Sequence, residues 1–337
     1  MVLPRAIPLL VVLCLGCESP GGSGDVVQTD TLTFIETVRL GADDTQGIES
    51  LVPLPSFGAL AERGGYVLVG TPNSGPVRVF DREGKYEGRV GDSGQGPGEL
   101  MGSTTALVRG DSVWVFDAGS GRVVIFSLSG RRPLATLTQR LIPFVRRAGW
   151  SGNRLVIPAL RPEAESGGFS LLHAFDGETL AHEASYGDIE ALLGASDESA
   201  QDLAAMVPGE VCETSGGRLV FAPSVARAAS LQWVSDVSSE AFPGAGPDSA
   251  ETRGLACRPG GHIWHFVAVS GEKKHFVLRT YDDRGHLTGD QVVDGIRFPE
   301  REFWDFQVRV LDTDQDGTVL VVDADSSGAP RLRLGRF

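Results

Sequence analysis

A glycine-containing turn that leads into a short apolar strand occurs six times in this chain. The turns are followed by a second β-like run, as in SVWVFDAGSGRVVIFSLSG, and most of these second runs end in an aromatic residue and a turn. Repetition at roughly 40–50 residues is typical of a β-propeller, in which each repeat is one blade. The sequence therefore predicts an all-β, six-bladed propeller over residues 30–337. The six copies begin at Gly64, Arg109, Ser151, Gly216, Gly260 and Gln315.

The two ends of the repeat region predict how the ring closes. The last repeat is one strand short, because the chain stops at Phe337 after RLRLGRF. The β-like run TLTFIETVRL, at 31–40, precedes the first repeat and has no blade of its own. We expect this N-terminal strand to complete the last blade, which leaves no long unpaired edge in the ring.

The N-terminus is typical of an exported chain. One positive charge, Arg5, precedes the apolar run AIPLLVVLCL, which is too short to span a bilayer and fits the core of a signal peptide. The run ends in Gly16 and Cys17, and resembles a bacterial lipobox, so residues 1–16 are the expected signal peptide and Cys17 the expected acylated residue. Residues 17–29, rich in Gly and Ser, would form a flexible tether. An ordinary signal peptide cut elsewhere, or an uncleaved anchor, is the alternative.

The charge of the chain restricts its partners. The formal net charge is −14, and such an acidic surface repels both phosphate backbones and anionic lipid. We therefore expect no nucleic-acid partner, contact with a membrane through the lipid anchor alone, and a monomer. The expected location is extracytoplasmic, at the periplasm or the cell surface.

Two insertions break the repeat. The segment 187–209 has apolar residues at helical spacing, and the segment 295–306 concentrates aromatic residues. Both follow an outermost strand and precede the next innermost strand, so we expect them on one face of the disc. Phe303, Trp304 and Phe306 are candidate contact residues for a binding partner, or they cap the core of the sixth blade.

The join between the first two repeats carries a family resemblance. It reads GQGPGEL, is followed by an inner strand, and leads to a strand–turn–strand that contains Asp117, Arg122, Phe126 and Gly130. In these motifs the chain resembles NHL-like repeats and, more closely, bacterial six-bladed β-propeller lipoproteins. The resemblance implies an extracytoplasmic propeller and carries over no catalytic residue. We expect Glu99 to cap backbone amides in the loop. The loop residues are Gly94, Gly96, Pro97, Gly98 and Glu99.

An acidic turn near the C-terminus is a candidate calcium loop. Asp312, Asp314 and Asp316 precede a glycine, and Asp323 occupies the twelfth place, where a calcium loop needs a closing carboxylate. However, an apolar strand follows in place of a helix, and Asp-rich hairpin turns need no metal. The alternative is an acidic β-turn with no cofactor.

The predicted inner strands supply the remaining candidates for a site. They contain more arginine than carboxylate or histidine, including Arg146 and Arg253, which favours a polar or anionic ligand near the axis. The alternative is that these arginines serve packing and surface ion pairs. His262 and His265 are three residues apart on a strand and so point to opposite faces. We therefore expect a binding or scaffolding module for a protein, a peptide or an envelope glycan. A hydrolase or lyase with its site at the channel mouth is the alternative.

Two cysteines remain in the predicted propeller. Cys212 and Cys257 lie on the innermost strands of consecutive blades, shortly before a Gly-Gly turn. An oxidising compartment favours a disulfide between them. The two cysteines can come close enough to bond, because innermost strands are where blades come closest. The alternative is a pair of small buried apolar side chains.

Overall fold

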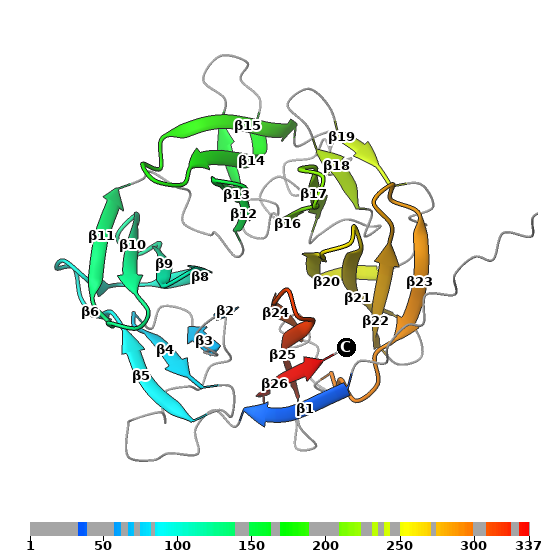
Figure 1. Ribbon diagram of the computed structural model, residues 1–337, viewed down its shortest axis with the longest axis horizontal. Coiled ribbons are helices and arrows are strands. Elements are labelled where there is room, and N and C mark those ends of the chain that lie inside the picture. The colour runs from blue at the N-terminus through cyan, green and yellow to red at the C-terminus, as the bar shows by residue number, and fades with distance from the viewer. Residues whose placement is uncertain are drawn as a thin grey trace, which may run out of the picture.

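The strands form a ring of blades around a central axis (Figure 1). The computed structural model describes residues 33–38, 57–61, 67–70, 75–81, 85–138, 148–162, 169–188, 209–223, 231–234, 239–242, 250–270, 274–298, 308–324 and 330–336. Within these residues the strands make six four-stranded antiparallel sheets and one short two-stranded parallel sheet. The predicted six-bladed, all-β propeller is therefore confirmed.

Each blade contains four strands that run outward from the axis. In the first three blades they are β2 (Phe57–Leu60), β3 (Val67–Gly70), β4 (Val77–Phe80) and β5 (Tyr86–Val90); β8 (Ser103–Arg109), β9 (Ser112–Asp117), β10 (Arg122–Ser127) and β11 (Pro133–Thr138); and β12 (Gly149–Ser151), β13 (Arg154–Pro162), β14 (Phe169–Asp176) and β15 (His182–Asp188). In the next two blades they are β16 (Glu210–Glu213), β17 (Leu219–Ala222), β18 (Gln232–Val234) and β19 (Ser239–Ala241); and β20 (Ala250–Cys257), β21 (Ile263–Val269), β22 (His275–Tyr281) and β23 (Leu287–Val292). The small parallel sheet joins β6 (Asp92–Ser93) to β7 (Glu99–Leu100).

The sixth blade is closed by the N-terminal strand. It contains β24 (Arg309–Thr313), β25 (Thr318–Ala324) and β26 (Pro330–Arg336), and β1 (Thr33–Val38) is its outermost strand. The strand β1 pairs antiparallel with β26, with Thr33 opposite Arg336 and Val38 opposite Leu332. The predicted closure of the ring is confirmed.

Successive apolar side chains of a strand point to opposite faces of the blade and pack it against both neighbouring blades. On β9, Val113 and Val115 contact the first blade, whereas Trp114 and Phe116 contact the third. Successive side chains of a strand point to opposite faces, so one strand contributes to two interfaces. Six such buried clusters are described, one between each pair of neighbouring blades.

The innermost strands β2, β8, β12, β16, β20 and β24 surround the axis and run in the same direction (Figure 1). Residues near the ends of neighbouring inner strands meet: the Leu60 amide donates to Asp312 Oδ2 at 2.7 Å. We call the face where these strands end the turn face, defined by the turns at 110–111, 152–153, 215–218, 259–262 and 315–317. The opposite face, where the inner strands begin, is the entry face.

Several predicted segments lie outside the described residues. The expected inner strand of the third blade began near Phe144, whereas β12 begins at Gly149 and residues 139–147 are not described. The same holds for 189–208 and 299–307, so the predicted helical insertion, the shared face of the two insertions, and Phe303, Trp304 and Phe306 remain predictions. Residues 1–32, with the expected signal peptide, Cys17 and tether, are also outside. Within the described part of the chain, no helix has the length and apolar character needed to cross a membrane.

Candidate functional site

A cavity of about 930 Å³ lies on the propeller axis, and residues of all six inner strands line it. A ring of blades leaves such a channel because each blade packs only on its neighbours. Ligand sites in proteins typically have volumes of roughly 300–1,000 Å³, so the cavity is large enough for a small molecule or for the end of a chain.

The charged lining of the cavity differs from the predicted excess of arginine. Among the described lining residues, carboxylates outnumber guanidinium groups. One reason is that β20 begins at Ala250 and thereby brings Glu251 into the wall. A second is that Arg258 turns away and donates to the backbone carbonyls of Asp314 and Gln315. The described charged lining consists of Arg109, Arg253, Arg309, Glu210, Glu213, Glu251, Asp312 and Asp314.

Arg253, one of the two arginines singled out from the sequence, lines the cavity from β20. It sits at a β-bulge, where the register to β21 shifts between Thr252 and Gly254, and its side chain is 4% exposed. Its guanidinium contacts the Glu251 carboxylate, which also lies 3.2 Å from Lys274 Nζ. A buried charge is tolerated when it is paired, so this cluster fixes the position of Arg253 in the wall. Arg146, the other arginine, is outside the described residues.

A hydroxyl and an imidazole meet in the same wall. Thr252 lines the cavity, and its Oγ1 lies 3.0 Å from Nε2 of His265, which is fully buried in β21. Burial, and after it the charge of Arg279 on β22, lowers the pKa of His265 to about 3. His262 is exposed and His265 buried, as their spacing predicts. No sequence motif points to the Thr252–His265 pair, because the contact depends on cross-strand register.

This pair has the geometry of an activated nucleophile but not its acid–base character. A general base works best when its pKa lies near the operating pH. An imidazole with a pKa near 3 stays neutral at physiological pH but binds a proton weakly. The arrangement therefore orients the Thr252 hydroxyl in the cavity wall and gives little support for proton abstraction.

A disulfide also lines the cavity. Cys212 and Cys257 are bonded in the structure, with their Cα atoms 5.6 Å apart. The bond joins β16 and β20, the innermost strands of the fourth and fifth blades, as the sequence positions of the two cysteines predict. It covalently fixes one side of the cavity.

Other blades are joined at the turn face by different contacts. They include amide-to-carboxylate hydrogen bonds, a cation–π contact and side-chain-to-carbonyl hydrogen bonds. Such local links hold the rim of the cavity in place. The contacts join Leu60 to Asp312, the Arg109 guanidinium to the Trp150 ring (4.6 Å), Ser151 and Gly152 to Glu213 (2.7 and 2.9 Å), and Arg258 to the carbonyls of Asp314 and Gln315.

The acidic candidates for calcium are not gathered into one site. Asp314 Oδ1 accepts the amides of Asp316 and Thr318, at 3.0 and 2.8 Å, as an acidic turn does. Asp323 lies at the other end of β25 and is paired with Arg331 and Arg333. In the described ranges, no group of three or more His, Cys, Asp or Glu side chains is placed to hold a metal ion.

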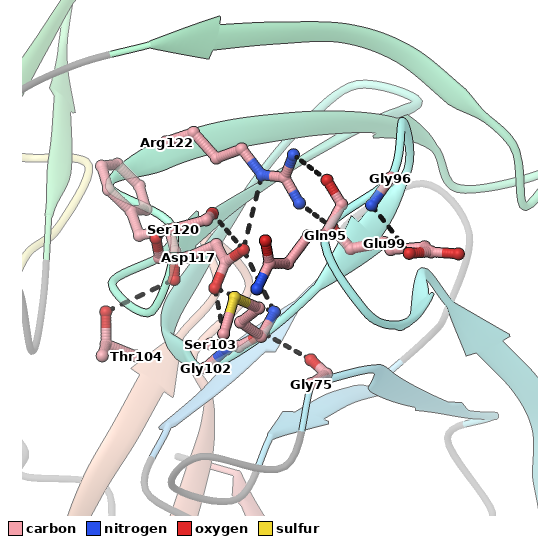
Figure 2. Close-up of polar contacts among 12 residues, drawn as sticks. Gly75, Gln95, Gly96, Glu99, Gly102, Ser103, Thr104, Asp117, Ser120 and Arg122 are labelled. Atoms are coloured by element: carbon pink, nitrogen blue, oxygen red, sulfur yellow. Dashed lines mark hydrogen bonds and ion pairs between the residues drawn. The ribbon is translucent and has the colours of Figure 1, made fainter.

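The glycine-rich loop between the first and second blades is held partly by contacts within itself (Figure 2). Glu99 Oε2 accepts the Gly96 amide at 2.7 Å, which is the capping role expected for Glu99. A Cβ at Gly94, whose φ is +147°, would lie 2.1 Å from the same carboxylate oxygen, so glycine is required there. The loop residues thus contact one another and are not directed at the axial cavity.

Two residues of the next hairpin fasten the loop. Asp117 is 1% exposed, and its carboxylate accepts the amides of Met101 and Gly102 at 3.1 and 2.8 Å and the Ser120 hydroxyl (Figure 2). Arg122 donates to the carbonyls of Gln95 and Glu99, at 3.0 and 2.6 Å, and lies 3.5 Å from Asp117. The motif is therefore structural: a buried ion pair ties the loop between two blades to the second blade.

Comparisons with known proteins agree with this architecture. The family described as a 6-bladed beta-propeller matches residues 60–145, the stretch that contains the glycine-rich loop. The chain has the fold of a six-bladed β-propeller. Among solved structures, a Bacteroides fragilis protein described as exported is similar at a TM-score of 0.55 and 10% identity, over 91% of this chain and 95% of that one. A member of the DUF4221 family from Bacteroides vulgatus is similar at a TM-score of 0.54 and 10% identity, over 83% and 91%. No curated protein matches the sequence.

Proposed function

We propose that this propeller is an extracytoplasmic binding module that takes part of a protein, a peptide or an envelope glycan into its axial cavity. The cavity of about 930 Å³ is the observation that carries the proposal. Its walls combine backbone, apolar side chains that include Phe57 and Trp150, and charged groups of both signs, which suits a ligand with polar and apolar parts and a low net charge. A simple anion is less well matched, because carboxylates outnumber guanidinium groups among the described lining residues.

The acid–base character of the residues in the cavity wall favours binding over hydrolase or lyase chemistry. The Thr252 hydroxyl is within hydrogen-bond distance of His265, yet the low pKa of this imidazole makes it a weak base. The inter-blade contacts at the turn face hold the rim fixed, and a preformed site loses little entropy when a ligand binds.

A pair of matched glycine variants tests the cavity. Gly110 and Gly152 occupy equivalent turns, with φ of +58° and +57°, and a Cβ at either would meet open space. Gly110 lines the cavity, whereas Gly152 is not among its described lining residues. Asparagine tolerates positive φ, so Gly110→Asn and Gly152→Asn should cost similar stability. For ligands found by thermal-shift screening of neutral oligosaccharides and short peptides, we expect Gly110→Asn to weaken binding about tenfold and Gly152→Asn to leave it unchanged. Equal effects, or no ligand in either class, would contradict the proposal.

The location is the second part of the proposal. The apolar N-terminal run supports passage across a membrane, as does the similar fold of a protein that is described as exported. We propose that Cys17 carries a lipid that holds the propeller at the membrane surface. Substituting Cys17→Ser should move the protein from the membrane fraction to the soluble fraction, because no acyl chain would be attached. A variant that still sediments with membranes, with the Gly/Ser-rich segment intact, would show that the anchor lies elsewhere.

A further inference from the structure

The outermost strands of four blades share a β-bulge at their second residue, and the outermost strand of the sixth blade, β1, has its bulge at Ile35, its third residue. The third and fourth strands of these blades lose register by one residue, which leaves an extra residue on the outer strand. A bulge of this kind twists the edge and hinders pairing with other chains. The extra residue is Glu87 on β5, Leu134 on β11, Glu183 on β15 and Thr288 on β23.

The second blade departs from this pattern. Glu87, Glu183 and Thr288 are exposed and polar, but Leu134 is apolar and 48% exposed. The strand β11 reads PLATLT and has no charged residue, whereas each of the other five outermost strands contains at least one. Charged side chains are a common protection of edge strands against pairing. The second blade therefore presents the least protected edge among the described strands.

The edge of β11 is accessible. It lies on the outer rim of the disc, with β10 on its inner side (Figure 1). Residues 132–136 are exposed. Pro133 has no amide to donate and Leu134 is the bulged residue, so the regular, pairing-competent part of the edge runs from Ala135 to Thr138.

The charges around β11 indicate what kind of segment fits it. Arg131 and Arg132 directly precede the strand, on a chain whose net charge is −14. Arg132 is exposed and also interacts with Asp111, whose pKa it helps to lower after the larger effects of hydrogen bonds from Ser127 and Ser129. The two arginines and this carboxylate leave one net positive charge at this end of the strand. A second copy of the chain is disfavoured as a partner, because each copy carries the same −14.

We propose that β11 is a docking edge for an extended segment of a partner protein, which pairs antiparallel to it as a fifth strand of the second blade. Backbone hydrogen bonds supply the affinity in this mode of recognition, and alternate side chains supply the specificity. The segment has uncharged, β-branched side chains opposite Ala135 to Thr138. Because the pairing is antiparallel, its C-terminal end reaches Arg132, and an acidic residue there completes the match.

The probe is a fluorescent peptide of alternating threonine and valine that ends in two aspartates. We expect it to bind the full chain, with anisotropy rising on titration and with slower hydrogen exchange at the amides of β11. Leu134→Glu places in β11 the residue that β5 and β15 carry at this bulge. It should weaken binding about tenfold or more, because a charge is introduced at the pairing edge. Thr288→Glu makes the same change on β23 and should leave binding unchanged.

The outcomes separate the alternatives. No binding to the native chain, or equal affinity of the two variants, overturns the proposal. Equal binding of a peptide that ends in two lysines overturns the assignment of the acidic end. A native dimer in sedimentation that Leu134→Glu dissociates shows that a second copy occupies the edge instead. Should Leu134→Glu fail to fold by circular dichroism, Thr136→Glu tests the same edge with the same expected result.

Discussion

Replacing Asp117 by alanine is expected to lower the free energy of unfolding by about 3–5 kcal/mol, because one partner of a buried ion pair is removed. The carboxylate is fully buried and accepts the amides of Met101 and Gly102, and Arg122 lies beside it. Without it, the amides of Met101 and Gly102 lose their acceptor and the Arg122 guanidinium loses its ion-pair partner. Urea unfolding, followed by tryptophan fluorescence, measures the change.

The control for this prediction is Asp111→Ala in the same blade. Asp111 also accepts several hydrogen bonds, from Ser127 and Ser129, but it lies in an exposed turn where water replaces them. Its removal should have a clearly smaller effect. If the two alanine variants unfold at the same urea concentration, the loop is not fastened by Asp117 in the way described.

Acidification is expected to destabilise the propeller through His265. The unfolded imidazole binds a proton below about pH 6.5, whereas the folded one stays neutral until about pH 3. The unfolded state therefore binds more protons in this window, so the full stability is present above pH 6.5 and is lost as the pH falls toward 3. The slope that this group contributes is up to about 1.4 kcal/mol per pH unit.

The measurement is the free energy of unfolding as a function of pH for the native chain and for His265→Gln. The variant should lose part of the slope between pH 6.5 and 3, whatever its stability at neutral pH. His286→Gln is the matched control, since His286 is exposed and pairs with Asp282 at the surface. An unchanged slope in His265→Gln would mean that the imidazole is hydrated or protonated in the folded state.

The fold was predictable because it depends on local patterns that repeat. The run from Val113 to Phe116 is apolar throughout and its side chains point to opposite faces in turn, which is enough to place β9 between two blade interfaces. The unmatched run at 31–40 and the short last repeat predict the closure by β1. The glycine-rich loop was identified for the same reason, since its φ requirements are local and only glycine meets them cheaply.

The contents of the cavity were less predictable, because bulges change the facing of side chains. The bulge at Arg253 shifts the alternation of β20 by one residue, so the adjacent residues Thr252 and Arg253 both line the cavity, which strict alternation does not predict. The Thr252–His265 contact and the Asp117–Arg122 link both join residues on different strands. Their geometry depends on register and packing, which a residue-by-residue interpretation does not contain.

The way in which β1 closes the ring has a mechanical consequence. Thr33 lies opposite Arg336, so both ends of the described chain meet at the same end of one antiparallel ladder. A force that separates the two termini would load the hydrogen bonds of this ladder one pair at a time, beginning with that pair. The β1–β26 seam should therefore peel at low force, whereas a pull on any internal loop must shear several packed strands together. If the N-terminus is held, a pull on the C-terminus therefore opens this ladder first.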